Sequence, residues 1–188
     1  MAAILIDKPT TQVNNYGTGG LFSQTGASTP IQNTTDQLTL IDGGVGTLSV
    51  PAFGFNVGDT FSAYMSGILS ANNGNTLDIH VQTTSGVVLS DSLPIVMRNA
   101  TDLPWRLQLT FVIWATGGAG VASILTSGTF EYEENANDKF NAYPIRYINN
   151  TTFDTTTPNT LDILAQWNVA SVTNSIQSYI FVLSKIYG

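Results

Sequence analysis

Cysteine is absent from this sequence of 188 residues, and histidine occurs once, as His80. The lack of cysteine excludes disulfides, thiol nucleophiles and thiolate metal sites. A single histidine also excludes zinc sites built on a pair of histidines. No G-x-S-x-G motif, which carries the nucleophilic serine of many hydrolases, occurs in the chain. We therefore expect a protein that is not an enzyme and that uses no cofactor and no metal.

Charged residues are also scarce, at 10% of the chain against about 25% in an average protein. Only six are Lys or Arg, against 13 Asp or Glu, and the net charge is −7. Six scattered cations cannot line a phosphate backbone, so we expect no nucleic-acid binding. No apolar run reaches the roughly 18 residues of a membrane helix, so we expect no membrane insertion. The first residues, MAAILIDKPT, do not resemble a secretory signal peptide.

The chain is rich instead in short β-type segments separated by turn residues. Residues 76–82 alternate strictly, with Leu77, Ile79 and Val81 on one face. Residues 105–132 contain two longer apolar segments on either side of a glycine-rich turn. No stretch repeats apolar residues at helical spacing over three turns. The sequence therefore predicts an all-β protein, of the sandwich or jelly-roll type.

The beginning of the chain has a different composition from the rest. Residues 10–20 are polar and glycine-rich and show neither helical nor strand periodicity. We interpret residues 1–37 as an extended N-terminal arm or lead-in segment, with Leu21 and Phe22 as a candidate anchor. Residues 38–188 are then the single folded domain.

The last predicted strand, residues 176–187, is apolar on both faces. Its second, aromatic face needs a cover, because an exposed patch of this kind would promote aggregation. A loop or the N-terminal arm could cover it, or it lies in a subunit interface, where Tyr and Phe are enriched. We favour the interface, and the candidate interface residues are Tyr179, Phe181, Leu183 and Tyr187.

Several short motifs, each weak by itself, occur in order along residues 38–188. They are VPAF at 50–53, VGDTF at 57–61, WRL at 105–107, FDT at 153–155, NTLDI at 159–163, QW at 166–167 and the final strand. Together they resemble the trimeric head domains of phage tail and other virion proteins. Those domains share the jelly roll of the tumour necrosis factor and complement globular-head superfamily.

The resemblance implies an antiparallel jelly roll of about ten strands, assembled as a homotrimer with the last strand near the three-fold axis. It implies a viral, non-enzymatic protein of the virion, made in the host cytoplasm since no signal peptide is seen. Residues 1–37 are a candidate attachment point for another virion protein. The number of strands and the trimer are expectations from the resemblance, whereas the apolar last strand was identified from its own residues.

Three predicted loops combine polar side chains with one or two apolar or aromatic residues, as saccharide recognition requires. They lie at residues 72–75, 97–102 and 135–141. Three copies on a trimer would act together, so that weak sites give strong attachment to a host-surface glycan or receptor. The candidate ligand-binding residues are Asn72, Asn73, Asn75, Arg98, Asn99, Asp102, Asn137 and Asp138.

Two other functions stay open at this point. A purely structural capsid-decoration or assembly protein would bind no small ligand. A carbohydrate-active hydrolase on the same scaffold would need two carboxyl groups within about 10 Å of each other, and nothing in the sequence selects such a pair. His80 lies beside Asp78 on the polar face of its strand, and we interpret it as a surface or interface histidine rather than as part of a Ser–His–Asp triad.

Overall fold

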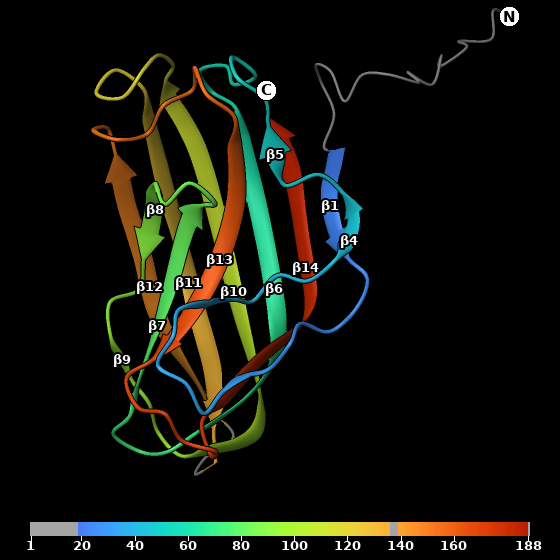
Figure 1. Cartoon of the computed structure of the whole chain (residues 1–188), viewed down its shortest axis with the longest axis vertical. Helices are drawn as coiled ribbons and strands as arrows, with labels where there is room; N and C mark the ends of the chain where they lie inside the picture. Colours follow the sequence, from blue (N-terminus) through green and yellow to red (C-terminus); the bar gives the residue numbers. More distant parts are fainter. Residues whose placement is uncertain (1–18, 136–138, 188) are drawn as a thin grey trace, which may run out of the picture.

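The structure, a computed structural model, describes residues 19–135 and 139–187 (Figure 1). These residues form fourteen strands and no helix, and all paired strands are antiparallel. The prediction of an all-β protein is therefore confirmed. Without a helix, the described part of the chain has no helical segment that could cross a membrane.

The larger of two sheets has eight strands. Its order is β12-β11-β10-β6-β14-β1-β4, and β2 pairs with β14. The five long strands are β6 (Thr60–Ala71), β10 (Ala100–Ala115), β11 (Ser123–Glu134), β12 (Lys139–Asn149) and β14 (Ser175–Tyr187). The three short ones are β1 (Gly19–Gln24), β2 (Ile31–Gln32) and β4 (Gly44–Gly46).

The smaller sheet has six strands and faces the larger one across a shared core. Its order is β3-β13-β7-β8, with β5 paired to β13 and β9 paired to β7. Its strands are β3 (Leu38–Thr39), β5 (Ser49–Val50), β7 (Thr76–Thr83), β8 (Val88–Asp91), β9 (Ile95–Val96) and β13 (Asn159–Trp167).

The core is formed by the alternating inward side chains of both sheets. The predicted inward face of β7, Leu77, Ile79 and Val81, is completely buried. Two buried tryptophans each donate a hydrogen bond to a backbone carbonyl of another strand. The Trp105 indole N–H donates to the Ile68 carbonyl (3.0 Å), and the Trp167 indole N–H donates to the Ile31 carbonyl (3.1 Å). Buried indoles with such partners stabilise a core without leaving an unpaired donor.

Part of the segment expected to precede the domain belongs to the larger sheet. β1 pairs with β14 on one side and with β4 on the other, and Phe22 is buried against Phe181, with ring centroids 5.7 Å apart. Ile31 in β2 is also buried. Leu21 and Phe22 are thus strand residues, and the folded region begins before residue 38. Residues 1–18 lie outside the described part of the chain.

A β-bulge in β14 changes which side chains face inward. The pairing of β14 with β6 shifts between Ser178 and Ile180, so Tyr179 and Ile180 both lie on the outer surface, 46% and 48% exposed. From there on the alternation is reversed, and Phe181 and Leu183 are buried in the core. A bulge adds one residue to one strand and so inverts the side-chain pattern that follows it.

The predicted interface set is therefore wrong for two of its members. Phe181 and Leu183 pack inside the chain and cannot contact a second subunit. Tyr179 does lie on the outside. For Tyr187 the structure describes only the backbone, which pairs with Thr60. The apolar outer face of β14 consists instead of Ile180, Val182 and Ile186 next to Tyr179.

Candidate functional site

The loops that the sequence analysis selected meet at one end of the molecule (bottom of Figure 1). The loop between β6 and β7 lies against the segment between β9 and β10 and against the loop between β13 and β14. The turn that follows β11 lies against the segment between β9 and β10. We call this the asparagine end, and define it by Asn72, Asn73, Asn75, Asn99, Asn135 and Asn174.

Asparagine groups join the three predicted loops. The backbone N–H of Asn73 donates to Asn99 Oδ1 (2.9 Å), and the N–H of Asn135 donates to the Asn99 carbonyl (3.0 Å). Asn135 Oδ1 in turn accepts the N–H of Thr101 (3.2 Å). Asn99 thus connects loops that are far apart in the sequence and holds them at fixed positions.

A fourth loop, which the sequence analysis did not select, supports the other three. Asn174 is fully buried, and its Oδ1 accepts the backbone N–H of Asn72 (3.2 Å) and the side-chain amide of Asn75 (3.1 Å). The Asn72 amide donates to Thr173 Oγ1 at 2.5 Å. Asn174 stands in a polar stretch, residues 168–174, where nothing in the sequence distinguishes a buried asparagine from an exposed one.

Several polar groups at the asparagine end still face solvent. Asn72, Asn73, Arg98 and Asn99 are exposed, whereas Asn75 is half-buried. Within the described residues, neither the Asn73 amide nor the Arg98 guanidinium has a hydrogen-bond or ion-pair partner. Amides offer both donors and acceptors and a guanidinium offers five donors, which is a set that suits hydroxyl-rich ligands. Chemically, this surface can bind a ligand through hydrogen bonds.

The remaining predicted ligand residues are Asp102, Asn137 and Asp138. Asp102 lies next to the cluster, tied to β6: its N–H donates to Ser70 Oγ (2.9 Å), and its Oδ1 accepts the Ser70 hydroxyl (3.1 Å). It adopts a left-handed backbone with φ 52°, a conformation that Asp tolerates better than most residues. Asn137 and Asp138 lie outside the described residues.

Tyr132 supports the asparagine end from the core side. It is completely buried, its Oη accepts the backbone N–H of Arg98 (2.9 Å), and its ring stacks on Tyr143 with centroids 6.0 Å apart. Burial is the main cause that raises the pKa of Tyr132 to about 12, and the hydrogen bond from Arg98 opposes it. The phenol is therefore uncharged at neutral pH, and its oxygen acts as a fixed acceptor for the backbone N–H of Arg98.

His80 makes a contact that was not expected. Its Nδ1 lies 2.9 Å from Asp91 Oδ2 on β8, and the neighbouring Asp78 on β7 has a pKa raised mainly by burial. No serine of the described residues is hydrogen-bonded to His80, so no Ser–His–Asp arrangement forms there. The described residues also contain no group of three His, Asp or Glu side chains placed to hold a metal ion.

No protein-family model, curated protein sequence or solved structure matches this chain. The features of this chain that bear on its function are therefore the asparagine end, the strand order and the surface of the two sheets.

Proposed function

We propose that this chain is a non-enzymatic jelly-roll head of a virion, which assembles as a homotrimer and attaches to a host-surface glycan or receptor through its asparagine end. The observation that carries the ligand-binding role is the grouping of exposed asparagines and Arg98 at one end, on loops held by hydrogen bonds. Rigidly held loops bind with a smaller loss of conformational entropy than mobile ones.

The strand pairing supports the jelly roll. β1 pairs with β14, β3 with β13, β6 with β10 and β7 with β8, so the first strand of the series meets the last, the second meets the next to last, and so on inward. This nested antiparallel pairing is what results when one long hairpin is rolled up into two sheets, which is the jelly-roll topology. The hairpin of β11 and β12 extends the larger sheet beyond this series.

The outer face of the larger sheet supports assembly into a trimer. Ile180 and Ile186 are 48% and 42% exposed, and Val182 pairs across the strands with Tyr64, which is also exposed. The intervening outward residues of β6, Ser62 and Ser66, are small and uncharged. On β14 and β6 this outer strip is uncharged and has several exposed apolar side chains, which is characteristic of the centre of a subunit interface. The neighbouring strands β10 and β11 carry the Arg106–Glu131 ion pair on the same face.

Solution mass is the first measurement that tests this proposal. Light scattering after size exclusion, at two dilutions, is expected to give three times 20.1 kDa, about 60 kDa. Ile180→Asp, on the outer face, is expected to give a folded monomer, because three carboxylates would be forced into the interface. Tyr147→Asp, an exposed change on the β12 edge strand, is the control and should leave the mass unchanged. A wild-type monomer contradicts the trimer.

Binding is tested on the assembled protein with a glycan array. The proposal predicts selective signals that fall when Asn73 or Arg98 is changed to Ala. A structural capsid-decoration or assembly role is the second candidate, favoured by the fact that Asn99, Asn135 and Asn174 use side-chain groups to join loops. An intact trimer that binds no glycan and no host-cell surface above background would favour this second role.

A further inference from the structure

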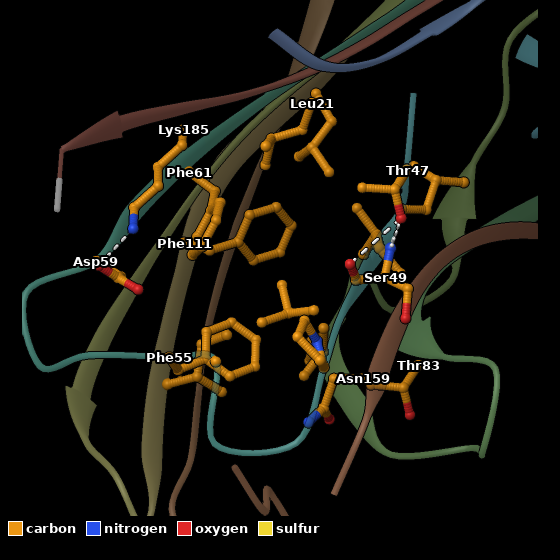
Figure 2. A pocket seen from close by; sticks show the side chains of 18 of the residues that line it. Leu21, Thr47, Ser49, Phe55, Asp59, Phe61, Thr83, Phe111, Asn159 and Lys185 are labelled. Carbon is orange, nitrogen blue, oxygen red and sulfur yellow. Dashed lines mark hydrogen bonds and ion pairs between the residues drawn. The ribbon is translucent and has the colours of Figure 1, made fainter. Parts of the chain in front are cut away.

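The opposite end of the molecule contains a cavity between the sheets. Its volume is about 280 Å³, and Figure 2 shows the side chains around it. The larger sheet, the smaller sheet and the loop before β6 all contribute to its wall. The main apolar lining residues are Phe55, Phe61, Phe111, Phe153, Leu161 and Leu183. We call this region the cavity end.

The cavity has a mouth as well as buried walls. Phe111, Phe153 and Leu183 are at most 5% exposed, whereas Thr47, Pro51 and Gly54 are exposed lining residues from one segment, 47–54. That segment therefore frames the opening to solvent. A small molecule can reach the apolar interior past it without separating the sheets.

One charged pair lies at the wall of this cavity. Lys185 Nζ is 2.8 Å from Asp59 Oδ1, and Asp59 is only 1% exposed (Figure 2). Asp59 Oδ2 accepts the backbone N–H of Asn56 (2.9 Å). Each oxygen of this buried carboxylate therefore has one partner, the Lys185 ammonium for Oδ1 and the Asn56 N–H for Oδ2. A carboxylate has about four acceptor sites, so capacity for a further donor is left.

The polar groups on the opposite side of the cavity are already paired. Asn159 donates to the carbonyls of Asp154 (2.8 Å) and Thr157 (2.9 Å), and Ser49 Oγ accepts the hydroxyl of Thr160 (3.0 Å). The Asp59 carboxylate is therefore the polar group of this cavity that has acceptor capacity left for a ligand. A hydrogen bond from a neutral donor to a buried charged group is stronger than one between two neutral groups, so a ligand hydroxyl that reaches this carboxylate gains from it.

We infer that the cavity binds a small uncharged molecule with an apolar body of about two fused rings and one hydroxyl group that donates to Asp59. Size supports this class: an engineered apolar cavity of about 150 Å³ holds one benzene, and this cavity has nearly twice that volume. Charge supports it as well. Asp59 and Lys185 together are neutral, so a charged ligand group would leave a net charge in an apolar site, which is strongly unfavourable.

The test uses 2-naphthol as the probe, titrated by calorimetry into the full-length protein. 2-Methoxynaphthalene has the same apolar body but no donor, and we expect it to bind about tenfold more weakly or worse, since a hydrogen bond to a charged group is lost. No detectable binding of 2-naphthol by the folded protein overturns the inference. Equal binding of the two probes overturns the role of Asp59.

Two matched leucine variants locate the site. Leu48 lines the cavity and is half-buried, whereas Leu38 on β3 is 43% exposed and does not line it. Leu48→Trp is expected to fill the cavity and abolish 2-naphthol binding, and Leu38→Trp is expected to bind like the unchanged protein. Thermal unfolding of both variants confirms that they are folded. Binding of 2-naphthol that survives in Leu48→Trp contradicts this location. This outcome does not depend on the glycan array, which tests the asparagine end.

Discussion

The two ends of this molecule close the same pair of sheets in different ways. At the asparagine end, side-chain amides bond to backbone groups of other loops, as Asn99 and Asn174 do. At the cavity end, aromatic rings pack edge to face, as Phe55 does on Phe61 and Phe153, and a cavity of about 280 Å³ is left between the sheets.

This difference shows how one core can end in two kinds of surface. Directional hydrogen bonds fix these loops at defined positions, because the side chains of Asn99, Asn135 and Asn174 each have a defined partner. Apolar packing has no such directionality, so rings that touch at their edges can still enclose a cavity. The asparagine end is therefore suited to a ligand that binds on the surface, and the cavity end to one that enters.

Loss of a ring at the cavity end is expected to have the largest effect on stability. Phe153 is 1% exposed and packs on Phe55 with centroids 5.7 Å apart. Phe153→Ala should lower the free energy of unfolding by about 3–5 kcal/mol, measured by urea denaturation. Phe53→Ala is the control at the same end, because Phe53 is 78% exposed. Similar losses for the two variants would show that the buried aromatic cluster does not stabilise this end.

At the asparagine end the corresponding key residue is polar. Asn174→Ala removes the acceptor of the Asn72 N–H and of the Asn75 amide, and leaves both without that partner. We expect a loss of about 2–3 kcal/mol in the free energy of unfolding. Asn168→Ala in the same loop removes one exposed bond, to the Thr76 N–H, and should cost about 1 kcal/mol. An Asn174 variant as stable as the unchanged protein would contradict the structural role of this amide.

Alkaline pH is expected to weaken the asparagine end in particular. The pKa of Tyr132 is raised in the folded protein to about 12 from 10.0. The stabilisation linked to this neutral phenol is therefore complete below pH 10 and is lost as the pH rises toward 12. Tyr132→Phe should lower stability at neutral pH by about 1 kcal/mol, since the Arg98 N–H loses its acceptor.

The pH dependence separates these two effects of Tyr132. Urea denaturation of both proteins at neutral pH and at steps between pH 10 and 12 should show a steeper decline for the unchanged protein. Parallel declines for the two proteins would mean that another group titrates in this range.

The smallest effect on stability is expected at Arg98. Its side chain is exposed and has no partner among the described residues, while the backbone N–H that reaches Tyr132 is kept in an alanine variant. Arg98→Ala should change the free energy of unfolding by no more than about 0.5 kcal/mol and yet reduce the glycan-array signal. A large loss of stability would mean that Arg98 has a structural role, and Arg98 would then no longer count as a ligand-binding group of the asparagine end.

Much of the fold could be read from local patterns. The strands at β7, β11 and β14 were predicted close to their observed bounds, because each alternates or is apolar between turn residues, whereas β10 begins at Ala100, five residues before the predicted segment. β12 was not predicted. It is an edge strand that contains Pro144 and many polar residues, and at an edge a proline costs no hydrogen bond in the sheet, so the usual signal against a strand does not apply.

The candidate site was only partly predictable, for a similar reason. The loops at 72–75 and 97–102 stand out by their asparagines and turn residues, and they do lie together. That Asn135 and Asn174 bond to those loops follows from strand order, which local sequence does not contain. Asn149 is another case: it is buried, and its amide donates to the Val88 carbonyl (2.9 Å) only because β12 lies against β8.

The sequence by itself determined that the chain forms strands, where most of them lie, and that it contains neither disulfides nor a zinc site built on cysteine or paired histidine. These properties depend on composition and on periodicity over a few residues. The tertiary structure alone decided which face of β14 is buried, since the bulge at Tyr179 exchanges inward and outward positions for Phe181 and Ile180. A one-residue change of register is set by pairing with β6, and no pattern within β14 contains that information.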